Sequence, residues 1–372
     1  MTKAAIGFAI VVLIASGLVV VYLLSCATNR VYSPGESLSL IAVGDSIGYN
    51  VKNEDLSSLA GMINDTDIFI FNLEGALRRA NDEALRCEGF PSQSVLTTDA
   101  SFAKYMKLAP VTIANMANNH VLDCGSEGIE STKRILSEHG ILSVGAGNGL
   151  QEACQPLVVN VRNWRVAFVS YNFVISPLVS AKPDEAGAAT LSACQHNYDE
   201  IRSQGADLII ALMHYGFWSS DVVEGQVQLV SSLMSAGVDV VIGHSPHIPQ
   251  AVMAAGGKLA LFSLGNFVFK PDYEMPPLAY TSIIAKIEFF KHSIDLTVRP
   301  IMIDDRGIPR IDPGSETLAR IAKASEEFKT FLDVRGNIGR LSIARKENVC
   351  EFPYWYRSLH VQLAPSLSLI HI

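Results

Sequence analysis

The chain has 372 residues, of which 49% are hydrophobic and 18% are charged, and its formal net charge is −8. This composition supports a large buried core and excludes an intrinsically disordered chain. No run of basic residues could follow a phosphate backbone, so we expect no nucleic-acid partner. An acidic protein can still act on an anionic substrate where a bound metal supplies positive charge.

The first predicted element is an uncharged apolar run over residues 4–25. A transmembrane helix needs about 20 such residues, and Lys3 before the run favours a cytoplasmic amino terminus. Residues 23–26 resemble a lipobox ending in Cys26, so a lipid anchor is one alternative, and a cleaved signal peptide is another. We expect residues 1–37 to be an anchor and linker in the cell membrane, single-pass or lipid-anchored, with the remaining chain on the extracytoplasmic side.

Beyond this linker, apolar strand-like segments alternate with helical patterns at 126–139 and 221–236. The predicted strands, rich in Val, Ile and Phe, are 38–43, 67–73, 111–117, 164–171, 207–213, 238–242 and 258–264, and two β-runs at 281–290 and 293–303 close the domain. This alternation predicts an α/β domain with layered sheets.

The character of the chain changes from about residue 311 onward. A charged helical piece covers 316–333, and an aromatic patch follows at 352–356. We expect a main domain over 38–310 and a C-terminal extension over 311–372, which either packs on that domain or contacts partner proteins.

Six cysteines occur along the chain, and none has the spacing of a zinc ribbon. Disulfides can form outside the cytoplasm, and Cys87–Cys124 and Cys154–Cys194 are conceivable pairs. Ordinary buried thiols are the alternative, because a sequence does not establish disulfide connectivity.

Polar side chains follow six of the predicted strands at their carboxyl ends. They are Asp45; Asn72 and Glu74; Asn118, Asn119 and His120; His214; His244 and His247; and Ser263 and Asn266. Ligands bind at this edge in open α/β sheets. Each residue alone has an ordinary interpretation as a turn, cap or loop residue, but six coincidences favour one common site.

The ligand types narrow the chemistry of that site. Imidazole, carboxylate and amide oxygen suit Zn²⁺, Mn²⁺ or Fe and differ from a sulfur-bound structural zinc. We expect one or two such divalent transition metals, where a pair would lie about 3.5–4 Å apart with one bridging carboxylate. Such a pair lowers the pKa of a shared water, and His120 is the candidate general acid for the leaving oxygen.

Six motifs occur in a fixed order along the chain. They are Gly44-Asp45, Asn72-Leu73-Glu74-Gly75, Ala117-Asn118-Asn119-His120 with Asp123 and Gly125, His214-Tyr215-Gly216, Gly243-His244-Ser245-Pro246-His247, and Ser263-Leu264-Gly265-Asn266-Phe267-Val268-Phe269. Together they resemble the capsule-synthesis CapA family of poly-γ-glutamate production, a branch of the calcineurin-like metallophosphoesterases. The resemblance spans residues 38–310 and implies a metallophosphoesterase-like layered β-sandwich flanked by helices.

The resemblance also implies roles for individual residues. The implied ligands are Asp45 and His247 for one metal and Asn119, His214 and His244 for the second, with Glu74 bridging in place of the usual aspartate and His120 as the acid. The implied supporting residues are Asn72, Asn118, Asp123, Ser263 and Asn266.

The chain departs from the family pattern in two places. Ile47 stands where the wider superfamily has a histidine, so the first metal site is one ligand short, and we expect His244 to be a firmer ligand than His247. Tyr215 replaces the usual tryptophan, and Phe217-Trp218 follow where an acidic residue is common. These two changes bear on the substrate more than on the metal.

The expected function is that of a membrane-tethered CapA-like protein that takes part in the synthesis or export of an extracellular anionic polymer. It would act through metal-dependent hydrolysis of a phosphoester or an amide-linked polymer. The alternative is a non-catalytic component of a polymer-export complex, in contact with other membrane proteins of a capsule system. A third interpretation, a solute-binding lipoprotein, leaves the histidines unexplained.

Overall fold

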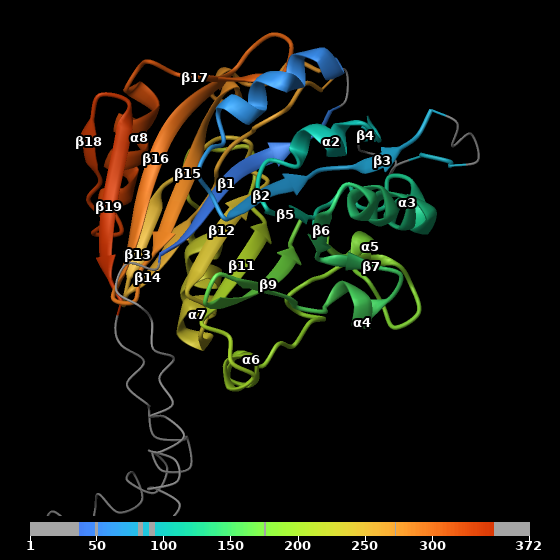
Figure 1. Ribbon diagram of the computed structural model, residues 1–372, viewed down its shortest axis with the longest axis horizontal. Coiled ribbons are helices and arrows are strands. Elements are labelled where there is room, and N and C mark those ends of the chain that lie inside the picture. Colours follow the sequence, from blue (N-terminus) through green and yellow to red (C-terminus); the bar gives the residue numbers. More distant parts are fainter. Residues whose placement is uncertain are drawn as a thin grey trace, which may run out of the picture. The chain divides into compact units, whose positions relative to one another are not determined.

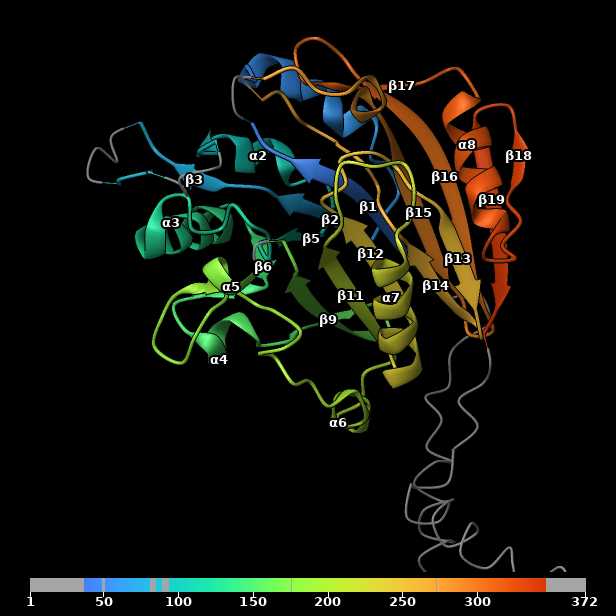
Figure 2. The same cartoon turned by 180° about the vertical axis from the view of Figure 1, so that it is seen from behind.

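The computed structural model describes residues 37–48, 51–80, 85–88, 94–174, 176–271 and 273–345. These residues belong to one compact unit, Gly35–Arg345, drawn in Figures 1 and 2. The apolar run at 4–25, Cys26 and the aromatic patch at 352–356 lie outside the described residues. Within the part of the chain that is described, no helix is long and apolar enough to cross a membrane.

The larger sheet combines parallel and antiparallel strands. Its order is β18-β19-β16-β15-β1-β2-β5-β6, with β17 on β16. The strands are β1 (Leu38–Ser46), β2 (Ile68–Leu73), β5 (Val111–Asn115), β6 (Ile141–Val144), β15 (Thr281–Phe289), β16 (Ser293–Ile303), β17 (Pro309–Ile311), β18 (Asp333–Arg335) and β19 (Ile338–Ala344). Strands β1, β2, β5 and β6 pair in parallel, whereas β15 and β16 are antiparallel to their neighbours.

The second main sheet has the order β13-β14-β12-β11-β9-β8. Its strands are β8 (Leu157–Val161), β9 (Trp164–Asn172), β11 (Leu208–His214), β12 (Val240–His244), β13 (Val252–Ala255) and β14 (Lys258–Leu261). Strands β9, β11, β12 and β14 pair in parallel. Small two-stranded sheets join β3 (Ala76–Arg78) to β4 (Thr97–Asp99) and β7 (Ala146–Gly147) to β10 (Gly187–Ala188).

Helices pack around the sheets (Figures 1 and 2). They are η1 (Asn53–Gly61), α2 (Phe102–Met106), α3 (Gly125–Glu138), α4 (Leu150–Ala153), α5 (Ser176–Val179), α6 (Tyr198–Ser203), α7 (Glu224–Ala236), η2 (Pro277–Tyr280) and α8 (Glu316–Glu326). Helix α3 contacts β3 and β6, and α7 contacts β12. The predicted α/β architecture with layered sheets is therefore confirmed.

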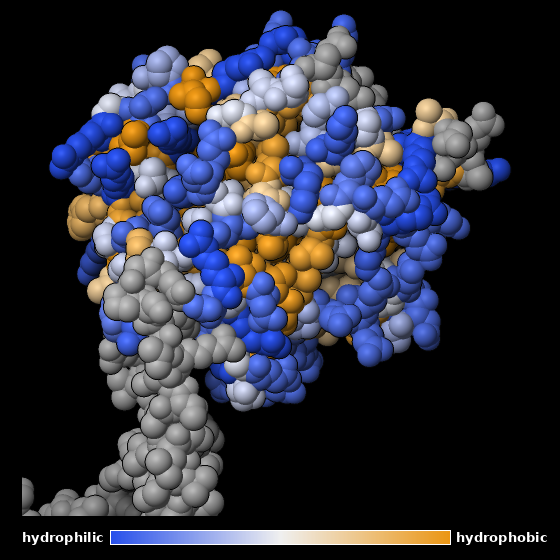
Figure 3. Space-filling model, in the orientation of Figure 1, coloured by the Kyte–Doolittle hydropathy of each residue, from blue (hydrophilic) through white to orange (hydrophobic). Residues whose placement is uncertain are grey.

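Burial on both faces explains why the central strands read as continuous apolar runs. Every residue of β1, β2, β11 and β12 is buried. One face of these strands meets the other sheet and the opposite face meets helices, so neither face requires polar residues. On the surface drawn in Figure 3, hydrophilic residues predominate and hydrophobic ones gather toward the middle.

The chain beyond residue 310 contributes to the same compact unit. Strand β19 pairs with β16, and α8 contacts β13 and β16. The hydroxyl of Ser325 accepts a hydrogen bond from the Val252 amide over 2.8 Å, and that of Thr330 accepts one from the Ala254 amide over 2.9 Å. The segment expected as a C-terminal extension thus supplies one edge of the large sheet as far as Arg345, because β16 offers it a strand to pair with.

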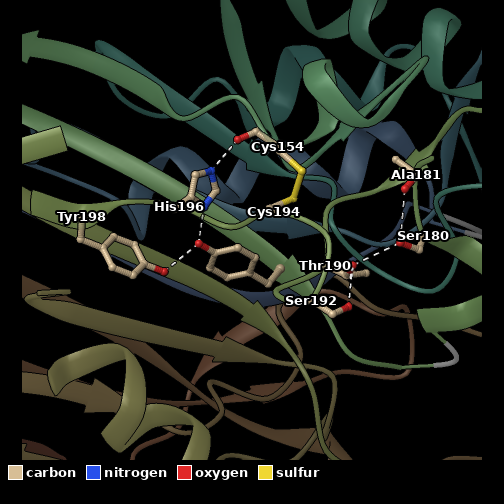
Figure 4. Close-up of a disulfide and its surroundings, with 9 residues drawn as sticks. Cys154, Ser180, Ala181, Thr190, Ser192, Cys194, His196 and Tyr198 are labelled. Carbon is tan, nitrogen blue, oxygen red and sulfur yellow. Dashed lines mark hydrogen bonds between the residues drawn. A yellow bond between two sulfur atoms is a disulfide. The ribbon is translucent and has the colours of Figure 1, made fainter. Parts of the chain in front are cut away.

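Both conceivable disulfides are confirmed: Cys87–Cys124 and Cys154–Cys194. Figure 4 shows the second bond beside His196, whose Nε2 lies 2.6 Å from the Cys154 carbonyl oxygen. The other ring nitrogen of His196 contacts the hydroxyl of Tyr171 on β9. This disulfide is therefore connected by hydrogen bonds to the second sheet.

Candidate metal centre

A β-bulge turns Asp45 toward the second sheet. The register of β1 against β2 shifts between Ala42 and Asp45, so that Asp45 pairs with Asn72 instead of Leu73. Because side chains alternate between the faces of a strand, a shift of one residue moves Asp45 to the opposite face. Asn72 Nδ2 then donates to Asp45 Oδ1 over 2.7 Å, and Asn115 Nδ2 donates to Asn72 Oδ1 over 3.0 Å.

A matching polar row ends the parallel strands of the second sheet. Asn172, His214 and His244 are paired in register across β9, β11 and β12 and share one face. His214 Nδ1 lies 3.3 Å from Asn72 Nδ2, and His244 Nε2 lies 3.2 Å from the Val43 carbonyl oxygen. The two rows therefore meet between the sheets, at the carboxyl ends of their strands, as the sequence pattern predicts.

Close backbone contacts hold the two rows together. A Cβ atom on Gly44 would lie 1.8 Å from the Gly265 carbonyl oxygen, so only glycine fits at residue 44. The Asp45 amide donates to that same Gly265 oxygen over 2.9 Å. Ser263 Oγ accepts from the Gly265 amide over 3.2 Å, and Asn266 Oδ1 lies 2.9 Å from His247 Nδ1. Ser263 and Asn266 are therefore supporting residues: Ser263 holds the backbone at Gly265, and Asn266 holds the ring of His247.

Asp45, Glu74 and His247 form the most compact group of candidate ligands. Their potential ligand atoms all lie within 4.8 Å of one another, and all three side chains are buried. His247 Nδ1 lies 3.3 Å from Asp45 Oδ2, and its Nε2 lies 3.8 Å from Glu74 Oε1. Glu74 Oε2 is buried without a hydrogen-bond partner. An orphaned carboxylate oxygen of this kind is costly unless a cation satisfies it.

One residue expected at the second metal also approaches Glu74. His214 Nε2 lies 2.7 Å from Asn119 Oδ1 and 3.7 Å from Glu74 Oε1. His244 Nδ1 is buried and has no hydrogen-bond partner. Glu74 Oε1 therefore lies near a histidine of each ligand group, at 3.7 Å from His214 and 3.8 Å from His247, as a bridging carboxylate requires. The compact group of candidate ligands contains His247. That His244 binds a metal more firmly than His247 stays a prediction.

Burial sets the protonation of these side chains. It raises the pKa of Glu74 well above its usual value, and the carboxylates of Asp45 and Asp123 raise it further. Burial lowers the pKa of His214 well below its usual value, and it also lowers the pKa of His244 and of His247. Neutral imidazole is the form that binds a metal, so the donor set fits a divalent transition metal.

The segment Gly243–His247 carries an unusual backbone. Ser245 and His247 have φ angles of 94° and 56°, which non-glycine residues rarely adopt and which cost on the order of 1–3 kcal/mol each. The Ser245 amide donates to Asp45 Oδ2 over 3.1 Å. The His247 ring packs between Trp218 and Phe269, with ring centroids 4.3 and 4.9 Å away. These contacts hold the strained loop in place.

The candidate acid His120 is oriented by a buried carboxylate. Its Nδ1 lies 2.8 Å from Asp123 Oδ2, which also accepts the Leu96 amide over 2.7 Å. Asn118 Oδ1 accepts from the His120 amide over 3.1 Å, and Asn118 Nδ2 donates to the Leu73 carbonyl over 2.7 Å. Asp123 and Asn118 therefore fix the ring and the backbone of the acid.

A cavity of about 300 Å³ opens above this group. Its lining includes Glu74, Asn119, His120 and His247. A substrate in this cavity would reach both the candidate ligands and the candidate acid.

Ile47 fills the position where the wider superfamily carries a histidine. Its side chain is buried in an apolar cluster with Leu96, Ile248 and Phe269. This position therefore supplies packing next to the ring that contacts His247, and it supplies no ligand atom.

Sequence reasoning missed several residues of the polar rows. Asn115 lies inside a predicted strand, so it lacks the signal of a polar residue that follows a strand. Asn172 follows directly after the predicted strand 164–171 and carries the same signal as the residues that were found. The Ser170 hydroxyl donates to Asn115 Oδ1 from the opposite sheet, a contact that only the tertiary structure reveals.

Comparison with known proteins agrees with the motif pattern. The chain is 29% identical over 179 residues to the PGA biosynthesis protein CapA of Bacillus subtilis, covering 47% of each chain. It is 31% identical over 225 residues to the "Probable polyglutamine synthesis accessory protein" of Mycobacterium tuberculosis, covering 56% of this chain and 57% of that one. The chain thus spans about half the length of these curated relatives.

Among solved structures, the NAD nucleotidase of Haemophilus influenzae superposes with a TM-score of 0.39 and 14% identity, covering 88% of this chain and 61% of that one. The bacterial capsule synthesis protein PGA_cap model matches residues 41–271, more than half of the chain and all of the candidate ligands. The chain therefore belongs to the bacterial capsule synthesis family PGA_cap.

Proposed function

We propose that this chain is a metal-dependent phosphoester hydrolase of the metallophosphoesterase type that serves the synthesis of an extracellular anionic polymer such as poly-γ-glutamate. The observation that carries the proposal is the buried group Asp45, Glu74 and His247, with the orphaned Glu74 oxygen. Glu74 and His247 of this group line a cavity that His120 also lines. Membership of the capsule synthesis family supports the link to the polymer.

The proposed chemistry divides between a metal and the side chains of this chain. Bound divalent ions would lower the pKa of a water nucleophile and neutralise charge on the phosphoryl group. Asp45, Glu74 and His247 would hold one ion, and Asn119, His214 and His244 the other, with Glu74 between them. His120, held by Asp123, would donate a proton to the leaving oxygen.

The proposal also includes the cellular setting. The apolar run at 4–25 supports attachment to the cell membrane, by a single span or a lipid. The two disulfides support a location of the hydrolase on the extracytoplasmic side, where thiols are oxidised. Other membrane proteins of a capsule system are the proposed partners.

The test uses the purified full-length chain in detergent. Metal analysis should find Zn, Mn or Fe in stoichiometric amount, and the metal-loaded protein should hydrolyse p-nitrophenyl phosphate. Glu74→Gln should lose both metal and turnover, whereas Glu326→Gln, at an exposed position on α8, should lose neither. Metal-free wild type that hydrolyses the ester at the same rate would overturn the proposal.

The alternative is a weakly catalytic or non-catalytic component of a polymer-export complex. Ile47 favours it, because an apolar side chain stands where a ligand is usual. In cells that lack the chain, an active hydrolase predicts that the His120→Ala variant fails to restore polymer. Full restoration of polymer by His120→Ala would instead establish the non-catalytic role.

A further inference from the structure

Aromatic side chains at the mouth of the cavity are unusually exposed. Phe217, Trp218 and Tyr273 line the cavity and are 77%, 38% and 44% exposed. The rings of Trp218 and Tyr273 meet edge to face, with centroids 6.2 Å apart and an angle of 62° between their planes. Removal of large aromatic side chains from water is favourable. This group therefore offers a surface for a ligand.

The described residues that line the cavity carry no fixed positive charge. Among the described residues that line the cavity, none is lysine or arginine, and Glu74 adds a carboxylate. A polymer with one carboxylate per residue would therefore find no lysine or arginine partner among these described lining residues. The cavity is suited to a ligand that carries one anionic group for the metal and is otherwise neutral.

The aromatic surface lies directly beside the candidate metal ligands. The Trp218 ring packs on His247 with centroids 4.3 Å apart, and His247 belongs to the compact ligand group. A ligand group that contacts Trp218 on the side away from His247 would thus be separated from the metal ligands by about the thickness of the Trp218 ring. A cavity of about 300 Å³ is at the small end of ligand sites and suits a phosphoryl group with one ring.

On the basis of the proposed function, we propose that the substrate of this cavity is a phosphoester whose alcohol carries a flat aromatic ring, stacked on one of Trp218 and Tyr273 and in edge contact with the other. The polymer chain itself is then not the substrate. Stacking of a flat ring on an aromatic side chain typically strengthens binding by about tenfold. Trp218 and Tyr273 would be specificity-determining residues of the site.

The experiment compares two matched substrates with the metal-loaded, full-length protein. In 2-phenylethyl phosphate and 2-cyclohexylethyl phosphate, the ring is two carbons from the ester oxygen, so the leaving alcohols have similar pKa values. The rings are similar in size, and only the phenyl ring is flat. The variants are Trp218→Leu and Tyr273→Leu, with Phe331→Leu as the control at an exposed phenylalanine outside the cavity lining.

We expect wild type and Phe331→Leu to favour the phenyl substrate by about tenfold in kcat/KM, and Trp218→Leu and Tyr273→Leu to reduce that ratio to about twofold or less. A wild type without preference would overturn the proposal, as would a ratio that survives in both cavity variants. Because Trp218 packs on His247, Trp218→Leu could also change metal binding, and the metal content of the variant measures this. If metal is lost, Tyr273→Leu still tests the proposal.

A binding measurement separates this inference from the proposed hydrolysis. Calorimetry with the two corresponding phosphonates reports ring preference without any turnover. If no phosphoester is hydrolysed but the phenyl phosphonate binds about tenfold more tightly in a Trp218-dependent manner, the hydrolase proposal fails and the aromatic site stands. If esters are hydrolysed without ring preference in either assay, the hydrolase stands and the aromatic site fails.

Discussion

The floor and the mouth of the candidate site are built in opposite ways. The floor is defined as Asp45, Glu74, His214 and His244, which are all 2% exposed or less. The mouth is defined as Phe217, Trp218 and Tyr273, which are at least 38% exposed. Floor residues stand at or next to the ends of β1, β2, β11 and β12, whereas mouth residues lie in loops between elements.

This difference separates chemistry from selectivity. The floor inherits its geometry from strand register and sheet packing, so a change there should disturb metal binding for every substrate. The mouth has few constraints from the core, so a change there should alter which ester is accepted. Predictions for the floor are therefore large and general, and those for regions farther from it are smaller and more specific.

The largest effect is expected from Glu74→Gln. An amide in place of the carboxylate removes a charge that lies near His214 and His247, so kcat/KM for any phosphoester should fall on the order of 10³-fold or more. Metal analysis should show a matching loss of bound ion. A variant that keeps its metal and most of its activity would place the metal centre elsewhere.

The next effect concerns the acid. His120→Ala should lower kcat by about 10²-fold to 10³-fold for esters with poor leaving groups, with a much smaller loss for p-nitrophenyl phosphate, which needs little protonation. Asp123→Asn, which weakens the hold on the ring, should show the same pattern at smaller size. His292→Ala, at an exposed histidine, is the control. Equal losses for good and poor leaving groups would exclude His120 as the acid.

The two disulfides provide a matched pair of variants. They close loops of similar length, with sequence separations of 37 and 40, so removal of either by double serine substitution should lower the unfolding free energy by about 2–5 kcal/mol. Cys124 directly follows Asp123, so only loss of Cys87–Cys124 should also lower kcat, by about tenfold. Equal kcat in both variants at a temperature where both are folded would break this distinction.

The smallest effect concerns the pH dependence of stability in metal-free protein. The raised pKa of Glu74 means that the folded state keeps a proton that the unfolded state releases above pH 4.5, so stability falls as pH rises from there toward the folded pKa. The lowered pKa of His214 means that the unfolded state alone takes up protons below pH 6.5, so stability also falls with acidification.

Glu74→Gln isolates these two contributions. The variant should lose the decline on the alkaline side, about 1.4 kcal/mol per pH unit for one proton, and keep the decline on the acid side. Urea unfolding of metal-free wild type and variant between pH 5 and pH 8.5 measures both slopes. Identical alkaline slopes would show that Glu74 does not carry the raised pKa.

Much of the floor could be predicted from the sequence because strand ends are visible in it. Apolar runs followed by Asp, Glu or His mark Asp45, Glu74, His214 and His244, and parallel strands bring such ends to one edge. The disulfide pairs were also named, although their connectivity was open. Asn115 and Ser170 were not found, because their contact joins two sheets through residues far apart in the chain.

By itself the sequence determined the strand alternation, the ligand types and the family, because these depend on residue identity and local periodicity. Only the tertiary structure decided that β1 carries a bulge, that the two polar rows face each other, and that Trp218 stacks on His247. A bulge, the opposition of two sheets and a positive φ at His247 result from long-range packing. Periodicity within one strand carries no record of that packing, since each contact joins elements that are distant in sequence.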